Sequence, residues 1–134
     1  MINVTHLSKS FAEVKAVDDL SFEIKNGEVI GLLGPNGAGK STTMRMLTGF
    51  LMPDAGLIQI EDIEVTLHPI EAQMHIGYLP ENNPLYKDML VNEILYFSAK
   101  LKHIPHSEIQ STIDFVVKAV NIEEVFYRPI HELS

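Results

Sequence analysis

The chain has 134 residues and a composition typical of a folded protein of modest size. Hydrophobic residues make up 46% and charged residues 21%, enough for one core, since domains commonly run about 100 to 150 residues. Lys and Arg total 10 against 18 Asp and Glu, a net charge of −8, which disfavours binding to nucleic acid or directly to anionic lipid. No apolar stretch approaches the roughly 20 residues of a membrane-spanning helix and no secretory signal is visible, so we expect no direct membrane insertion and a cytoplasmic location.

The start of the chain is predicted to be antiparallel. Segments 20–25 and 28–33 are strand-like, and the dipeptide Asn26-Gly27 between them favours a two-residue hairpin because both positions tolerate positive φ. The second of these strands leads into a Gly-rich turn. Apolar residues at helical spacing then predict a helix over 40–50.

Further strands are expected over 57–60 and 75–79, with Pro69 at the first position of a helix between them. The acidic pair Glu61 and Asp62 follows the first of these strands and is interpreted as a turn at its end.

The second half of the chain is predicted to be helical. Helices are expected over 91–102 and 108–120, the second with an apolar face and with Ser107 and Gln110 as a capping box at its start. A mixed sheet region is thus followed by an all-helical region.

A phosphate-binding loop is the strongest motif. The segment GPNGAGKST fits G-x-x-x-x-G-K-[ST] and lies between a predicted strand and a predicted helix, the context that the motif requires. Glycines let the backbone turn its N–H groups inward, where they surround phosphate oxygens together with the helix N-terminus. Lys40 would reach the β- and γ-phosphates, the Ser41 hydroxyl would be a ligand of Mg²⁺, and Thr42 would add a hydrogen bond. The predicted nucleotide-binding residues are Gly34, Pro35, Asn36, Gly37, Ala38, Gly39, Lys40, Ser41 and Thr42.

The loop alone permits several classes of nucleotide-binding protein, but its neighbours narrow the choice. Residues 7–56 resemble the opening of ABC ATPases in order and spacing, and GPNGAGKST is that family's characteristic form of the loop. The segment GYLPENNPLY is similar to the loop before the helical subdomain in exporter-type and gliding-motility subunits, which points to the ABC-2 branch. The resemblance implies an α/β fold: a P-loop NTPase core with an antiparallel β subdomain over 1–81, and the beginning of an α-helical subdomain over 82–134, ending at the start of the signature motif.

The same resemblance implies roles for single residues. Phe11 takes the place of the aromatic that stacks on adenine, where the alternative is a ring that fills the core. Glu81 stands where the family often has glutamine, and as an oxygen ligand it would serve Mg²⁺ and the attacking water, the alternative being a solvated loop carboxylate. Leu133 and Ser134 resemble the first two signature residues.

The hydrolytic Asp, Glu and His of the family are not found after the phosphate loop. We therefore expect this chain alone to bind ATP weakly or not at all and not to hydrolyse it. The apolar face of the helix over 109–120 is expected to be partly uncovered, which would favour association or partial unfolding.

The function implied by the resemblance is that of an ATP-binding, energy-coupling subunit of an ABC transporter. Its partners would be a transmembrane permease and a second nucleotide-binding subunit, and the permease would hold it on the inner face of the cell membrane. The alternative is a permease-independent ABC ATPase acting as a soluble regulator. A small phosphate-loop kinase or GTPase is disfavoured, because no second basic lid segment and no Asn-Lys-x-Asp motif is present.

Overall fold

The computed structural model describes residues 1–81 and 85–133. The chain divides into two compact units, Met1–Tyr78 and Leu79–Ser134, and each is described by itself. Within the described ranges, no helix combines the length and apolar character that crossing a bilayer requires.

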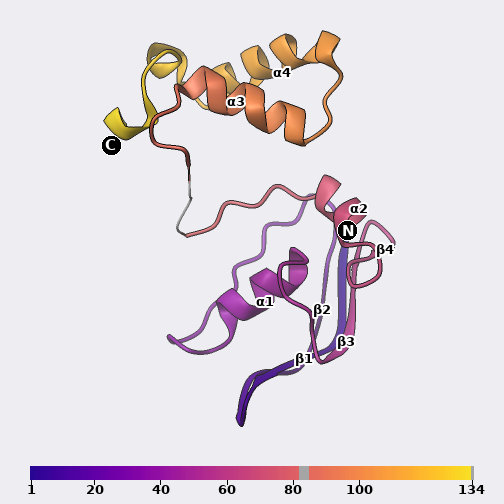
Figure 1. Ribbon diagram of the computed structural model, residues 1–134. Coiled ribbons are helices and arrows are strands. Elements are labelled where there is room, and N and C mark those ends of the chain that lie inside the picture. The colour runs from indigo at the N-terminus through magenta and orange to yellow at the C-terminus, as the bar shows by residue number, and fades with distance from the viewer. Residues whose placement is uncertain (82–84, 134) are drawn as a thin grey trace. The chain divides into compact units, whose positions relative to one another are not determined.

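The first unit is built on a four-stranded antiparallel sheet in the order β2-β1-β3-β4 (Figure 1). Ile2 of β1 pairs with Ile24 on one side and with Ile60 on the other; β2 pairs with β1 as far as Phe11, and β3 pairs with it as far as Ser8. The strands are β1 (Ile2–Phe11), β2 (Val14–Ile24), β3 (Ala55–Ile60) and β4 (Ile63–Glu64).

The antiparallel start is confirmed, but its hairpin is not the predicted one. β1 and β2 are joined at Ala12 and Glu13, with Ala12 at a φ of 51°, whereas the turn at Asn26-Gly27 ends β2 without starting a new strand. Residues 28–33 pair with no strand in the described chain, and Val29 is 98% exposed. The uncharged apolar run over 29–33 is typical of a strand covered on both faces, and such a strand forms only beside others that supply its hydrogen bonds.

The strand predicted over 57–60 is present as β3, whereas the one predicted over 75–79 is absent. The acidic pair forms the β3–β4 turn, with both φ values positive, at 47° for Glu61 and 67° for Asp62. Those signs are the ones that a two-residue type I′ hairpin requires.

Two helices complete the first unit: α1 (Lys40–Leu47) and α2 (Pro69–Met74), the second with its proline at the first helical position as predicted. α1 ends at Thr48, whose carbonyl accepts a hydrogen bond of 3.0 Å from the Gln73 side chain. Side chains from the sheet, from α1 and from α2 share one core, made of Val4, Leu7, Val17, Met46, Leu47, Ile58, Ile60, Val65 and Ala72.

The second unit contains α3 (Val91–Leu101) and α4 (His106–Ala119), followed by 3-10 turns at Glu123–Val125 and Ile130–Glu132. The predicted capping box is wrong: α4 begins two residues earlier, with Pro105 as its N-cap, so Ser107 lies inside the helix. The apolar face of α4 is partly uncovered, as expected, because Val116 is 36% and Val120 56% exposed. The other residues of that face are buried. Within this unit a small core is formed by Ala99, Ile109, Ile113 and Val117, with partly buried apolar residues of α3 and of the C-terminal segment around it.

The start of α3 carries half of a capping box. The Glu93 carboxylate accepts a hydrogen bond of 2.9 Å from the backbone N–H of Leu90, the N-cap residue, but the leucine side chain offers no acceptor in return. We expect Leu90→Thr to raise the free energy of unfolding by about 1 kcal/mol above that of the isosteric Leu90→Val, because the threonine hydroxyl completes the box. Urea unfolding followed by circular dichroism measures the difference, and equal stabilities would contradict it.

Candidate functional site

The predicted phosphate loop connects residue 33 to α1 in the first unit. Gly39 is the N-cap of α1 and has a left-handed φ of 81°. A β-carbon at Gly39 would lie 2.1 Å from the carbonyl oxygen of Ala16 in β2, far inside van der Waals contact. The end of the loop therefore packs backbone against backbone on the sheet, and only glycine fits there.

The Lys40 side chain folds back across its own loop. Its ammonium donates hydrogen bonds of 2.7 Å to the carbonyl oxygens of both Gly34 and Pro35. A full positive charge is thus held beside the N-terminus of α1, where the first N–H groups have no intrahelical acceptor and the helix dipole adds to the positive potential. This arrangement attracts an anion with several acceptor oxygens, such as a phosphate chain.

The first turn of α1 has one buried and one exposed hydroxyl side chain, Thr43 and Ser41. Thr43 is buried, and its hydroxyl donates to the Gly39 carbonyl at 3.0 Å, which ties the helix to the end of the loop. Ser41, in contrast, is exposed. An exposed hydroxyl beside Lys40 fits the predicted role at Mg²⁺, because this ion commonly takes one or two protein ligands together with substrate phosphates and water.

Phe11 is the last residue of β1 and lies at the hairpin end, where it pairs with Val14. The side chain is 48% exposed, so the ring does not fill the core. Ala16, which contacts Gly39, lies two residues beyond Val14 on β2, and the end of the hairpin that carries Phe11 is therefore also the end that supports the phosphate loop.

The remaining predicted site residues lie in the second unit. Glu81 is exposed, and its role at Mg²⁺ stays a prediction. Leu133 follows the last 3-10 turn, and Ser134 lies outside the described residues.

Two residues near Phe11 were not predicted. Lys9 and Asp54 form an ion pair of 2.6 Å, and the Lys9 ammonium lies 5.8 Å from the centre of the Phe11 ring. The hydrogen bond from Lys9, followed by that from the Ser10 backbone N–H, holds the pKa of the Asp54 carboxyl below its ordinary value. The alternation of β1, which puts Lys9 and Phe11 on one face, was the available sequence signal.

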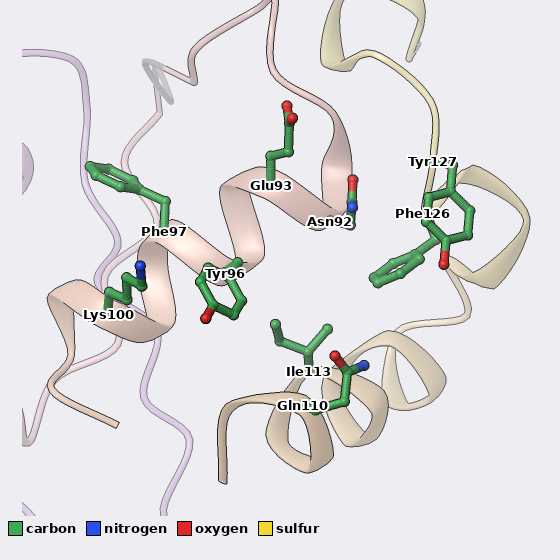
Figure 2. A pocket seen from close by; sticks show the side chains of 9 residues that line it. All are labelled: Asn92, Glu93, Tyr96, Phe97, Lys100, Gln110, Ile113, Phe126 and Tyr127. Carbon is green, nitrogen blue, oxygen red and sulfur yellow. The ribbon is translucent and has the colours of Figure 1, made fainter. Parts of the chain in front are cut away.

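A hollow of about 400 Å³ in the second unit was also not predicted. Figure 2 shows Tyr96 of α3 and Ile113 of α4 facing the same space. The Oδ1 atom of Asn92 is buried there and has no hydrogen-bond partner among the described residues. The hollow combines aromatic walls with polar side chains such as Asn92, Glu93 and Gln110, and none of the predicted nucleotide-binding residues lines it.

Comparison with known proteins identifies the family to which a chain with this fold and this loop belongs. Residues 17–134 match the family model described as ABC transporter. The chain belongs to the ABC transporter family. Its fold is that of an incomplete P-loop ABC domain, with an antiparallel sheet and helices, as predicted.

Relatives and solved structures of this ABC family chain support the assignment. It is 36% identical over 134 residues to the Nod factor export ATP-binding protein I of Ralstonia nicotianae, covering all of this chain and 42% of that protein. It is 33% identical over 134 residues to the spermidine/putrescine import ATP-binding protein PotA of Vibrio cholerae, covering all of this chain and 35% of that protein. The structure of CbiO1 from Clostridium perfringens, part of the ABC transporter complex CbiONQ, matches with a TM-score of 0.84 at 28% identity, covering 99% of this chain and 55% of that one. The chain thus spans less than half the length of these two curated relatives.

Proposed function

We propose that this chain is the nucleotide-binding part of an ATP-binding subunit of an ABC transporter, in which residues 34–42 bind Mg-ATP, and that the chain alone binds it only weakly. The observation that carries the proposal is the Lys40 ammonium, held by two loop carbonyls at the N-terminus of a helix whose N-cap glycine packs on β2. A triphosphate would accept hydrogen bonds from Lys40 and from the free N–H groups of the first turn of α1. Ser41 would hold the magnesium ion, which neutralises phosphate charge. The proposed role of Glu81 at Mg²⁺ rests on the resemblance to the family alone.

In the whole protein, ATP hydrolysis would drive a membrane permease. Two such subunits would close on ATP and reopen after hydrolysis, a shift between two populations governed by contacts to the γ-phosphate. The names of the relatives support coupling to transport: one serves export, another import, and CbiO1 is part of a transporter complex. We place the protein in the ABC-2 export branch on the segment GYLPENNPLY and on the likeness to the Nod factor export protein.

The second unit is the proposed contact to the permease, which would hold the subunit on the inner face of the membrane. Its hollow supports this role, because aromatic side chains such as Tyr96, Phe97 and Tyr127 are enriched at surfaces that bind another protein.

ATP binding is tested with the Lys40→Ala variant. We expect the dissociation constant for Mg-ATP to rise about 10- to 100-fold, because one charge-assisted interaction with the phosphates is lost. Lys118→Ala is the charge-matched control, since Lys118 is exposed near the end of α4 in the other unit. Equilibrium dialysis with labelled ATP gives both constants, and equal affinities for the two variants would refute the proposed site.

Hydrolysis is tested in the same preparations. We expect no steady-state ATP turnover by this chain alone. Turnover that disappears in Lys40→Ala would contradict this expectation and show that the catalytic residues lie within the chain.

A further inference from the structure

We propose that the ion pair between Lys9 and Asp54 positions the Phe11 ring for stacking on the purine base of a nucleoside triphosphate and leaves one face of that ring for the base. This inference rests on the proposed function, because it concerns how the same site holds its nucleotide. It gives a role to two residues that lie outside the phosphate loop.

Strand geometry brings the three side chains together. Lys9 and Phe11 are two positions apart in β1, and although the β1–β2 register shifts between Lys9 and Ser10, the Lys9 ammonium lies 5.8 Å from the centre of the Phe11 ring. Asp54 immediately precedes β3, and the next residue, Ala55, pairs with Ser8 of β1. The antiparallel register therefore places the Asp54 carboxylate opposite the end of β1, just before Phe11.

Asp54 extends the β1–β3 ladder by one residue before the start of β3. Its backbone N–H donates to the Ser8 carbonyl at 2.9 Å, and one carboxylate oxygen accepts from the Ser10 N–H at 2.7 Å. The other oxygen accepts from the Lys9 ammonium at 2.6 Å. Three successive residues of β1 are thus held by one aspartate, and Phe11 is the next residue in the strand.

Lys9 is unusually well covered for a lysine. Its side chain is only 15% exposed, and its ammonium lies 5.8 Å from the centre of the Phe11 ring, within the range of a cation–π interaction. The ion pair keeps the ammonium there and so restrains the ring from one side. Phe11 is nevertheless half exposed, which leaves ring surface for a flat ligand.

A Phe11 ring that Lys9 already restrains loses little conformational freedom when a base stacks on it. The affinity for a nucleotide is expected to be higher for this reason. Lys9 acts here as a positioning residue. Its contribution should therefore depend on Phe11 and on the presence of a base in the ligand, whereas a lysine that contacted phosphate would depend on neither.

The test compares Mg-ATP with inorganic tripolyphosphate, which has the phosphates but no base, in the full chain. We expect Lys9→Met and Asp54→Asn each to weaken Mg-ATP binding about two- to five-fold while leaving tripolyphosphate binding unchanged. In the Phe11→Ala background, Lys9→Met should have no further effect on ATP. Lys9→Arg, which keeps the charge and has a planar guanidinium that can stack on the ring, should retain most of the affinity.

Three results would overturn the inference. Equal weakening of ATP and tripolyphosphate by Lys9→Met would show a direct contact to phosphate. A full effect of Lys9→Met without Phe11 would show that Lys9 does not act through the ring. If Lys9→Met binds ATP as tightly as the unaltered chain, and binding still depends on Lys40, the role of the ion pair is refuted and the proposed function stands. If ATP binding by the unaltered chain does not depend on Lys40, the proposed function itself is refuted.

Discussion

Gly39→Ala is expected to destabilise the first unit by about 3 kcal/mol or more, against about 1 kcal/mol for Gly37→Ala. The two glycines have nearly the same left-handed φ, 81° and 84°, so the backbone strain of an alanine is the same at both. They differ in surroundings. A β-carbon at Gly39 would lie 2.1 Å from the Ala16 carbonyl oxygen, whereas one at Gly37 would meet nothing in the described chain within 4 Å.

Urea unfolding of the two variants, followed by circular dichroism, isolates this steric contact, because Gly37→Ala carries the same conformational cost. A Gly39→Ala variant as stable as Gly37→Ala would mean that the loop does not pack against β2 in solution. The same result would remove the structural reason for placing the loop and the hairpin end at one site.

Met46→Ala is the second substitution with a large expected effect, a loss of about 2 to 5 kcal/mol in the free energy of unfolding. The Met46 side chain is fully buried between α1 and the sheet, and its removal leaves a cavity under the helix that carries Lys40 and Ser41. Met44→Ala is the matched control on the same helix. Met44 is 41% exposed, and its truncation should change stability by no more than about 0.5 kcal/mol.

Thermal and urea unfolding distinguish the two methionine variants. Similar losses at both positions would show that α1 does not present its Met46 face to the core. That outcome would also weaken the site, since the position of the phosphate loop depends on where this helix is held.

Local signals in the sequence predicted the local structure well. The phosphate loop, the helix that follows it, the strand over 57–60 and the proline-led helix were all predicted from residue type and spacing over a few positions. The acidic turn after β3 was predicted as well, although its type was not. In each case the property that fixes the structure, such as a proline φ or a helical apolar stripe, is contained within the segment itself.

Pairing between strands was predicted poorly, because it depends on distant partners. The Asn26-Gly27 signal is stronger than that of Ala12-Glu13, where a residue with a β-carbon adopts positive φ, yet the hairpin forms at the second place. The apolar run over 28–33 indicated burial, but burial of a strand requires neighbours that the described chain does not supply.

In the candidate site, too, the contiguous part could be predicted and the part that depends on strand pairing could not. The loop could be located from the sequence because its motif is contiguous, and the nucleotide-binding role of its residues stays a prediction. Lys9 and Asp54 were not, because they lie far apart in the sequence and meet only through the β1–β3 register. A charged pair of this kind has no sequence pattern to identify it before the sheet is known.

The pairing of β1 with β3 also has a consequence for the order of folding. Ile2 meets Ile60, so the ladder closes a long stretch of chain that contains the whole phosphate loop and α1. Contacts so distant in sequence carry a large loop-closure cost and form slowly, whereas the α3–α4 contacts are local and form quickly. The phosphate loop should therefore take its shape late, after β1 and β3 have met. A nucleotide that binds only this late conformation would lengthen the lifetime of the folded state rather than hasten its formation.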